Sequence, residues 1–212
     1  MGLWNIVLDF LFPARCLRCR AEGAYLCRKC ATTLPSAEPP EDEWIHAVFS
    51  YQHKLARRAV WLLKYRGRTD LARALGSLLA EQLAEELAEL ETMENFRAPI
   101  LVPVPISSRR RRERGFNQAE LLARVVATEL KKEYCPALEK IRETEPQAKI
   151  KTRDARLKNL KDCFVVKNPE SVRGRNVVII DDVTTTGATA REARRALRQA
   201  GAKKIIACAL AH

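Results

Sequence analysis

Residues 177–189, VVIIDDVTTTGAT, limit the possible folds of this 212-residue chain more than any other stretch. Four consecutive apolar residues are typical of a parallel strand that is covered on both faces of its sheet. Asp181 and Asp182 follow this run, and a turn rich in Thr and Gly comes next. Ligands of open parallel sheets bind beyond the carboxyl ends of the strands, which is where the two aspartates fall. The stretch therefore predicts an α/β fold with a ligand site at the end of this strand.

The turn after the aspartates has the composition of a phosphate site. Gly187 permits a positive φ, and the beginning of the helix expected from residue 188 offers free N–H groups to an anion. The turn contains no Lys, which excludes a Walker A loop. Backbone amides and hydroxyl groups would hold the phosphate instead, and the residues that supply them are Thr184, Thr185, Thr186, Gly187, Ala188 and Thr189.

Two carboxylates beside a phosphate site repel a simple phosphate, so the ligand has to offer other groups as well. Ribose 5-phosphate offers a 2,3-diol, whose hydroxyl groups donate hydrogen bonds to carboxylates such as those of Asp181 and Asp182. Mg²⁺ bound near these carboxylates would reduce the repulsion. The pattern therefore predicts a sugar phosphate as the ligand.

Strands and helices alternate along the rest of the chain. Strand-like segments lie at 44–52, 99–105, 136–141, 176–182 and 203–210, and helical periodicity marks 54–65, 70–93, 117–132 and 188–200. This alternation predicts a parallel sheet flanked by helices. Residues 144–161 are charged and have no clear period, so we expect a mobile loop there.

Four of the seven cysteines lie close together, in two Cys-x2-Cys pairs formed by Cys16, Cys19, Cys27 and Cys30. Thiolates at this spacing can converge on one tetrahedral Zn²⁺, and so small and polar a segment has no core of its own. A redox pair and two disulfides are weaker alternatives, because the segment lacks a βαβ context and the expected compartment is reducing. We therefore expect a structural zinc whose four ligands all come from the protein.

The first residues, MGLWNIVLDFLF, are apolar, but they are too few to span a bilayer, which needs about 20 residues. They also lack the basic region of a signal peptide. We expect a short amphipathic helix there, no stable membrane insertion and a cytoplasmic protein. The chain then divides into an N-terminal helix with a zinc module at 1–33, a Pro- and Glu-rich linker at 34–43, and an α/β domain at 44–212.

An arginine run follows the strand-like segment 99–105 and offers charge for a second anion. The chain has a formal net charge of +12, which favours a polyanionic partner or a phosphorylated substrate. Arginine suits such a ligand because its planar fork pairs with two phosphate oxygens at once. A pyrophosphate site, a nucleic-acid contact and a solvated charged face all remain open, and the arginines concerned are Arg109, Arg110, Arg111, Arg112 and Arg114.

Residues 177–189 resemble the 5-phosphoribosyl-1-pyrophosphate (PRPP) motif of type I phosphoribosyltransferases, in which four apolar and two acidic residues precede a Thr/Gly phosphate loop. The resemblance implies the fold of that class, with Asp181 and Asp182 facing the ribose and Thr185 to Thr189 on the 5-phosphate. It also implies Mg²⁺ bound together with PRPP. Thr185 stands where purine-salvage members often have an acidic residue, which argues against that activity.

A wider resemblance covers nearly the whole chain. KYRG at 64–67, VPVPISSRRRRERGFNQAELLA at 102–123, TEPQAKIKTRDARLKNLKDCF at 144–164 and the four cysteines are similar, in this order with the PRPP motif, to the ComF family. That family is linked to the uptake of transforming DNA. The resemblance implies that residues 144–161 close over PRPP as a lid, and the residues that match the family pattern there or just beyond are Gln147, Arg156, Asn159 and Phe164.

Two functions follow from these resemblances. In the first, the protein is a phosphoribosyltransferase in which Asp181, Asp182 and Arg156 assist the displacement of pyrophosphate from ribose C1. Arg109 and Arg110 then bind that pyrophosphate. In the second, it is a non-catalytic DNA-uptake factor that binds single-stranded DNA or a helicase-like ATPase, with PRPP as a regulatory ligand. Such partners would bring it to the membrane periphery.

Overall fold

The structure is a computed structural model of the chain, which describes residues 14–66, 69–145, 150 and 152–212. The amphipathic helix expected at the N-terminus and Gln147 lie outside the described residues. Within this part of the chain, no helix is both long enough and apolar enough to cross a membrane.

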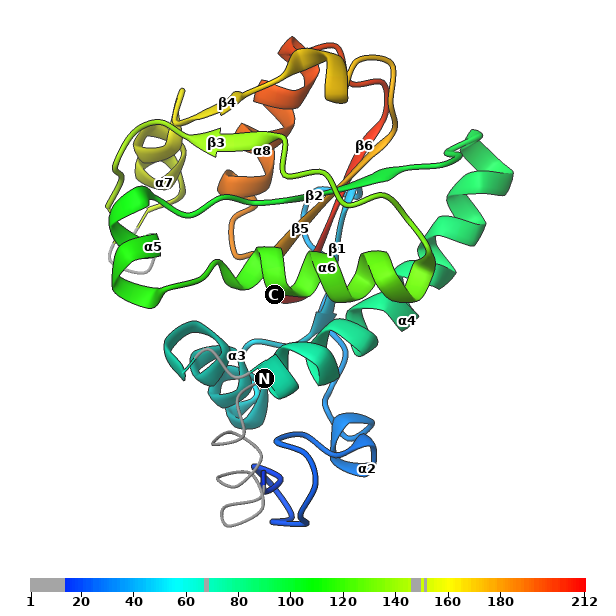
Figure 1. Ribbon diagram of the computed structural model, residues 1–212, viewed down its shortest axis with the longest axis vertical. Coiled ribbons are helices and arrows are strands. Elements are labelled where there is room, and N and C mark those ends of the chain that lie inside the picture. Colours follow the sequence, from blue (N-terminus) through cyan, green and yellow to red (C-terminus); the bar gives the residue numbers. More distant parts are fainter. Residues whose placement is uncertain (1–13, 67–68, 146–149, 151) are drawn as a thin grey trace, which may run out of the picture.

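The centre of the fold is a four-stranded parallel sheet with the strand order β1-β6-β5-β2 (Figure 1). Its strands are β1 (Ile45–Phe49), β2 (Ile100–Pro103), β5 (Val177–Val183) and β6 (Ile205–Ala211). β5 lies between two neighbours, and its residues from Val177 to Ile180 are fully buried. The expected parallel α/β sheet is therefore confirmed, and Asp181 and Asp182 lie just before Val183, the last residue of β5, at the carboxyl edge.

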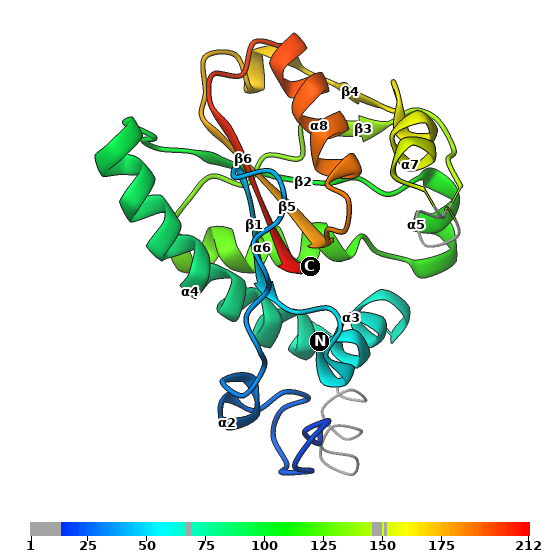
Figure 2. The same cartoon turned by 180° about the vertical axis from the view of Figure 1, so that it is seen from behind.

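Helices cover both faces of this sheet (Figures 1 and 2). Their bounds are Lys54–Arg66 for α3, Thr69–Glu94 for α4, Gln118–Leu130 for α6 and Ala188–Gln199 for α8. Alternate residues of β5 pack into the hydrophobic layers on opposite sides of the sheet, because successive side chains of a strand point to opposite faces. Val178 and Ile180 pack with α3, α4 and α6, whereas Val177 and Ile179 pack with α8.

A second, two-stranded sheet stands beside the first. β3 (Leu138–Lys140) pairs antiparallel with β4 (Phe164–Val166), and α7 (Arg153–Leu160) lies in the connection between them. The expectation of a mobile loop at 144–161 is therefore wrong for the residues of α7. Sequence periodicity does not reveal this helix, because Leu160 is its one buried position among those whose side chains are described. Thr152 caps the helix by accepting a hydrogen bond from Ala155 N at 3.3 Å.

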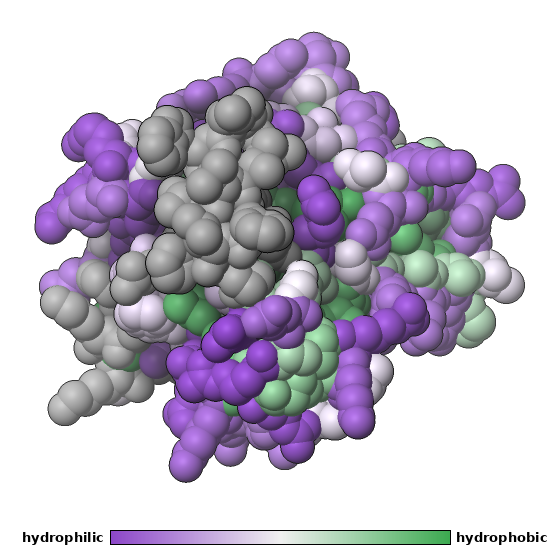
Figure 3. Space-filling model, turned by 60° about the horizontal axis from the view of Figure 1, so that its bottom comes forward, coloured by the Kyte–Doolittle hydropathy of each residue, from purple (hydrophilic) through white to green (hydrophobic). Residues whose placement is uncertain are grey.

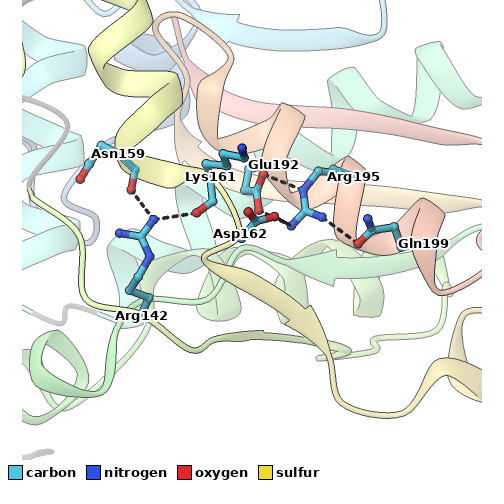
Figure 4. Close-up of polar contacts among 7 residues, drawn as sticks. All are labelled: Arg142, Asn159, Lys161, Asp162, Glu192, Arg195 and Gln199. Carbon is cyan, nitrogen blue, oxygen red and sulfur yellow. Dashed lines mark hydrogen bonds and ion pairs between the residues drawn. The ribbon is translucent and has the colours of Figure 1, made fainter.

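The carboxyl end of α7 is held from two sides (Figure 4). Arg142 donates from Nη2 to the carbonyl oxygens of Asn159 at 3.0 Å and of Lys161 at 2.6 Å. On the other side, Arg195 of α8 forms an ion pair with Asp162 at 3.0 Å. These contacts attach α7 to the second sheet and to α8.

The described part of the chain has three further short helices, and their sequences show no apolar period. They are α2 (Arg28–Ala31), α5 (Ser108–Arg114) and the 3-10 helix η2 (Pro169–Ser171). α5 contains the arginine run and has no buried residue. Its limits are set by caps instead: Ser107 Oγ accepts from Arg110 N at 3.4 Å, and Gly115 ends the helix with a φ of 79°.

The cysteine segment packs against helices α3 and α4, on one face of the sheet. Cys16, Leu26 and Cys30 belong to one hydrophobic cluster with residues of α3 and α4. The segment therefore shares its core with the α/β domain, although it lies at one end of the molecule (Figures 1 and 2).

Residues 34–43, expected as a linker, lie along β1. Ser36 forms a β-bridge with Phe49, and Ala37 N donates to Val48 O at 3.1 Å. This segment is therefore part of the ordered fold, and it connects the cysteine segment to the sheet.

Candidate functional site

The turn between β5 and α8 has the backbone that a phosphate loop needs. Gly187 has a φ of 72°, and a Cβ atom there would lie 3.0 Å from both Asp42 Oδ2 and Ile45 Cδ1, so glycine is required. Gly187 is the N-cap of α8 and adds no side-chain cap. Among the described residues, the amides of Thr185, Thr186 and Gly187 donate no backbone hydrogen bond. Their N–H groups are therefore available to an anion.

Asp182 forms a buried ion pair with Lys64, which α3 brings to the carboxyl edge of the sheet. Asp182 Oδ1 lies 3.1 Å from Lys64 Nζ, and the side chain of Asp182 is 6% exposed. Burial lowers the pKa of Lys64, but the charge of Asp182 and its hydrogen bond, together with the charge of Asp181, outweigh burial and raise the pKa. Asp182 Oδ2 is buried and has no hydrogen-bond partner in the described part of the chain. The pair thus leaves one carboxylate oxygen for a ligand hydroxyl or a cation.

Asp181 has different electrostatic surroundings. Its Oδ1 accepts a hydrogen bond from Asp182 N at 2.8 Å. Burial and the charge of Asp182 raise the pKa of Asp181 to about 8, although that hydrogen bond and Lys64 act in the opposite direction. A cation bound between the two carboxylates would favour the ionised form of both. The arrangement therefore fits a ligand that arrives with positive charge or with hydroxyl donors.

Two lysines at this edge are not among the residues that sequence reasoning selects. Lys64 belongs to the KYRG stretch, and the match of that stretch to ComF is the one signal that points to it. Lys140, on β3, donates from Nζ to Thr144 Oγ1 at 2.6 Å. Burial lowers the pKa of Lys140, and the nearby charge of Arg110 lowers it further. Lys140 in turn favours the ionised form of Asp181.

Arg156 lies against the turn between β5 and α8. It donates from Nη1 to Thr185 Oγ1 at 2.9 Å and from Nε to Ile150 O at 3.0 Å. Asn159 has a different role, because its side-chain amide accepts from Glu145 N at 3.1 Å and donates to Glu145 O at 3.0 Å. The segment 144–161 therefore brings Arg156 to the loop and uses Asn159 to stabilise its own backbone.

The arginine run divides into paired and unpaired side chains. Arg109 Nε pairs with Glu113 at 2.8 Å, and Arg111 Nη1 pairs with Glu120 at 2.7 Å. Arg110 forms no side-chain ion pair among the described residues. Of the two arginines expected at a pyrophosphate, Arg109 is thus already engaged within α5, whereas the guanidinium of Arg110 is available.

The four cysteines converge on one point. Their Sγ atoms all lie within 4.8 Å of one another, and Cys19 Sγ is 3.6 Å from Cys27 Sγ, so all four are free thiols. Burial alone would raise the pKa of Cys16, but the backbone N–H groups of Cys27, Cys19 and Arg18 favour its thiolate and bring the pKa down to about 6. Thiolates that accept N–H hydrogen bonds are suitable ligands for a tetrahedral structural zinc.

Comparison with known proteins assigns the class. Residues 114–212 match the family model described as a phosphoribosyl transferase domain. With the parallel sheet and the loop after β5, this match defines a protein with a phosphoribosyltransferase domain. Among solved structures, glutamine phosphoribosylpyrophosphate (PRPP) amidotransferase from B. subtilis, complexed with ADP and GMP, aligns with a TM-score of 0.43 and 20% identity. The alignment covers 71% of this chain and 30% of that chain.

Relatives that align over most of the chain show to which family of such proteins it belongs. DNA utilization protein YhgH of Escherichia coli (strain K12) is 32% identical over 215 residues, which cover 97% of this chain and 89% of that protein. Competence protein ComFC of Bacillus subtilis (strain 168) is 31% identical over 155 residues, which cover 73% of this chain and 58% of that protein. The chain belongs to the ComF family, as its motifs predict.

Proposed function

We propose that the protein binds PRPP at the carboxyl edge of its sheet and serves DNA uptake as a phosphoribosyltransferase of the ComF type. One observation carries the proposal: the buried Asp182–Lys64 pair, with its free carboxylate oxygen, adjoins a loop with free amides that Arg156 also contacts. The names of the relatives, DNA utilization protein and competence protein, support the part that concerns DNA uptake.

The groups at this edge suit the three parts of PRPP. The free amides of Thr186 and Gly187, at the beginning of α8, would hold the 5-phosphate. The carboxylates of Asp181 and Asp182 would accept hydrogen bonds from the ribose diol. Arg110, which is free of ion pairs among the described residues, would pair with the pyrophosphate.

Transfer at ribose C1 would break the bond to the pyrophosphate oxygen and form a bond to an acceptor. Mg²⁺, which Asp181 and Asp182 would hold together with oxygens of the ligand, supplies charge neutralisation for the leaving pyrophosphate. Arg156 would add positive charge near the phosphate loop. As part of α7, it would also help to exclude water from a ribose that is otherwise open to hydrolysis.

Pyrophosphate release from Mg·PRPP tests this function directly. The purified protein is incubated with Mg·PRPP and a panel of nucleobases and amines, and pyrophosphate is measured. We expect PRPP to bind and at least one acceptor to release pyrophosphate. Binding without release for every acceptor would make PRPP a regulatory ligand, and an absence of binding would contradict the proposal as a whole.

A second candidate function is the binding of single-stranded DNA, which an aromatic and basic surface favours. Trp61 and Tyr65 of α3 are 51% and 57% exposed, and their ring centroids lie 5.3 Å apart. The guanidinium of Arg114, from α5, lies 5.2 Å from the centre of the Tyr65 ring. Figure 3 shows the lower face of the molecule, where hydrophilic residues surround smaller hydrophobic areas. Unpaired bases stack on exposed rings while basic side chains contact the phosphates.

The same helix carries basic side chains in line with the two rings. Lys54 and Arg58 are exposed, and they precede Trp61 at helical spacing, so they share its face. Neither forms an ion pair within the part of the chain that the structure describes. α3 therefore presents a stripe of basic and aromatic side chains, which matches the charge and the bases of a single strand.

Replacing both Trp61 and Tyr65 by Ala should weaken the binding of an oligo-dT strand. Stacking is worth about 1–3 kcal/mol per base, so the loss is roughly fivefold to 150-fold for each base. Fluorescence anisotropy with a labelled strand measures this effect. Trp61→Phe is the matched control, because it keeps an aromatic ring, and PRPP affinity should not change in either variant. Equal DNA affinity in the parent protein and the double variant would show that Trp61 and Tyr65 do not stack on DNA bases.

A further inference from the structure

Two side chains hold the phosphate loop by its carbonyl oxygens, from the side opposite to its free amides. His212 Nε2 lies 3.0 Å from Thr185 O, and its Nδ1 lies 3.1 Å from Glu38 O. Arg191 donates from Nη1 to Thr186 O at 3.0 Å. Neither residue is part of a sequence motif, and neither belongs to the candidate site described above.

The planarity of the peptide group gives these contacts their importance. In a trans peptide the C=O and the N–H point in opposite directions. A hydrogen bond to Thr185 O therefore directs Thr186 N–H away from His212. In the same way, the bond to Thr186 O directs Gly187 N–H away from Arg191. These are the two amides proposed above to receive the 5-phosphate.

Both supporting side chains are themselves fixed by residues 34–43, the linker segment. Arg191 Nη2 forms an ion pair with Asp42 Oδ2 at 2.5 Å. Glu38 O contacts the ring of His212, whose backbone N–H donates to Phe49 O at 3.0 Å. The linker in turn is held by Ile45 N, which donates to Asp42 O at 2.9 Å, and by its pairing with β1. The support therefore has little freedom to move.

The charge of the support also favours an anion on the other side of the loop. Arg191 is a permanent cation, and His212 donates to both carbonyl oxygens only when both of its ring nitrogens carry protons. The hydrogen bond from the cationic Arg191 polarises the peptide group between Thr186 and Gly187, so that the Gly187 N–H becomes a better donor to a phosphate. Asp42 offsets part of the charge of Arg191 and keeps its guanidinium in place.

We propose that Arg191 and His212 are positioning residues, through which the linker orients the amides of Thr186 and Gly187 toward the phosphate of the ligand. This inference rests on the proposed function, because it takes the loop to be the 5-phosphate site. It assigns the linker a role in ligand binding that its Pro- and Glu-rich sequence does not suggest.

The test compares three ligands on matched variants. In Arg191→Ala and in His212→Ala, we expect the affinities for ribose 5-phosphate and for PRPP to fall about tenfold, since each variant loses one orienting hydrogen bond. The affinity for pyrophosphate alone should not change. Arg191→Lys and His212→Gln keep one donor each and should recover part of the affinity. Arg198→Ala, an exposed arginine on the same helix, is the control and should bind like the parent.

A second readout separates orientation from general loosening of the fold. The ¹⁵N–¹H resonances of Thr186 and Gly187 in the free protein should shift in both alanine variants, while those of β5 stay in place. If an alanine variant fails to fold, the same affinities and resonances are measured on Arg191→Lys and His212→Gln instead. Parent-like ribose 5-phosphate affinity in both alanine variants would overturn the inference and leave the proposed function standing. A parent protein that binds neither sugar phosphate would overturn both.

Discussion

Replacing Cys27 by Ser is expected to abolish zinc binding and to unfold residues 14–33. Structural zinc contributes an apparent binding free energy of about 10–16 kcal/mol in zinc-finger peptides, and this energy is lost when the site cannot form. Cys27 supplies one of the four thiol groups that converge within 4.8 Å. Elemental analysis under reducing conditions should find about one zinc per chain in the parent protein and none in the variant.

The unfolding should extend into α3, because the cysteine segment shares a core with it. Cys16 and Leu26 pack in one cluster with Leu55 and Leu63 of that helix. Hydrogen exchange should therefore show lost protection in residues 14–33 and in α3, with β5 and β6 unchanged. Cys135→Ser is the control, because Cys135 is buried outside the cysteine cluster and the variant should retain zinc. A parent protein without zinc, or equal exchange in both variants, would refute a structural zinc.

Asp182→Asn is expected to weaken PRPP binding by roughly tenfold to hundredfold. A hydrogen bond to a charged group is worth about 1.5–3 kcal/mol, and the variant loses an ionised acceptor. The free protein should also become less stable, because Lys64 loses its partner. Breaking a buried pair costs about 3–5 kcal/mol, and we expect less here, since the Lys64 side chain is 23% exposed. Calorimetry gives the affinity, and denaturant unfolding gives the stability.

Asp181→Asn should weaken PRPP binding to a similar extent but stabilise the free protein. Burial and Asp182 raise the pKa of Asp181 from its ordinary 3.8 to about 8. The folded state therefore keeps a proton that the unfolded state releases, and stability falls as the pH rises from about 4 to about 8. Asn has no such proton, so its advantage over Asp should grow across this window. By pH 7 it should exceed about 1.4 kcal/mol, the equivalent of one pKa unit.

Asp182→Asn is expected to destabilise the free protein and Asp181→Asn to stabilise it. This difference distinguishes the loss of a ligand contact from damage to the fold. A variant that folds more stably and yet binds PRPP less well has lost a ligand contact. Glu170→Gln is the control, because the exposed Glu170 pairs with Arg173 at η2 and its loss should not alter PRPP affinity. Parallel stability curves for the parent and Asp181→Asn between pH 5 and pH 8 would show that Asp181 is ionised in the free protein.

The main sheet and the cysteine cluster could be predicted from the sequence because their signals are local. The uninterrupted apolar run from Val177 to Ile180 needs burial on both faces, and this run alone indicates a central parallel strand. The spacing of the Cys-x2-Cys pairs likewise determines their convergence. α7 lacks such a signal, because it has no apolar stripe and is stabilised by its caps and by hydrogen bonds to its carboxyl end.

The contacts that complete the site come from residues far apart in the chain, so no local pattern announces them. Lys64 meets Asp182 only because α3 packs beside the carboxyl end of β5. His212 reaches the turn after β5 only because β6 lies next to that strand. Arg191 lies close to this turn in the sequence, but its ion pair with Asp42 depends on where the fold places the linker. Composition shows that basic and acidic residues are present, but the fold decides which of them pair and which of them stay free.

Titration of Mg·PRPP into the purified protein by calorimetry is the most direct test of the carboxyl edge as a PRPP site. The parent protein and the Asp181→Asn, Asp182→Asn double variant are compared at one pH and one Mg²⁺ concentration, with folding of both verified by circular dichroism. We expect saturable binding to the parent protein and no measurable binding to the folded double variant. Equal binding to both proteins, or no binding to the parent, would contradict the assignment of this site.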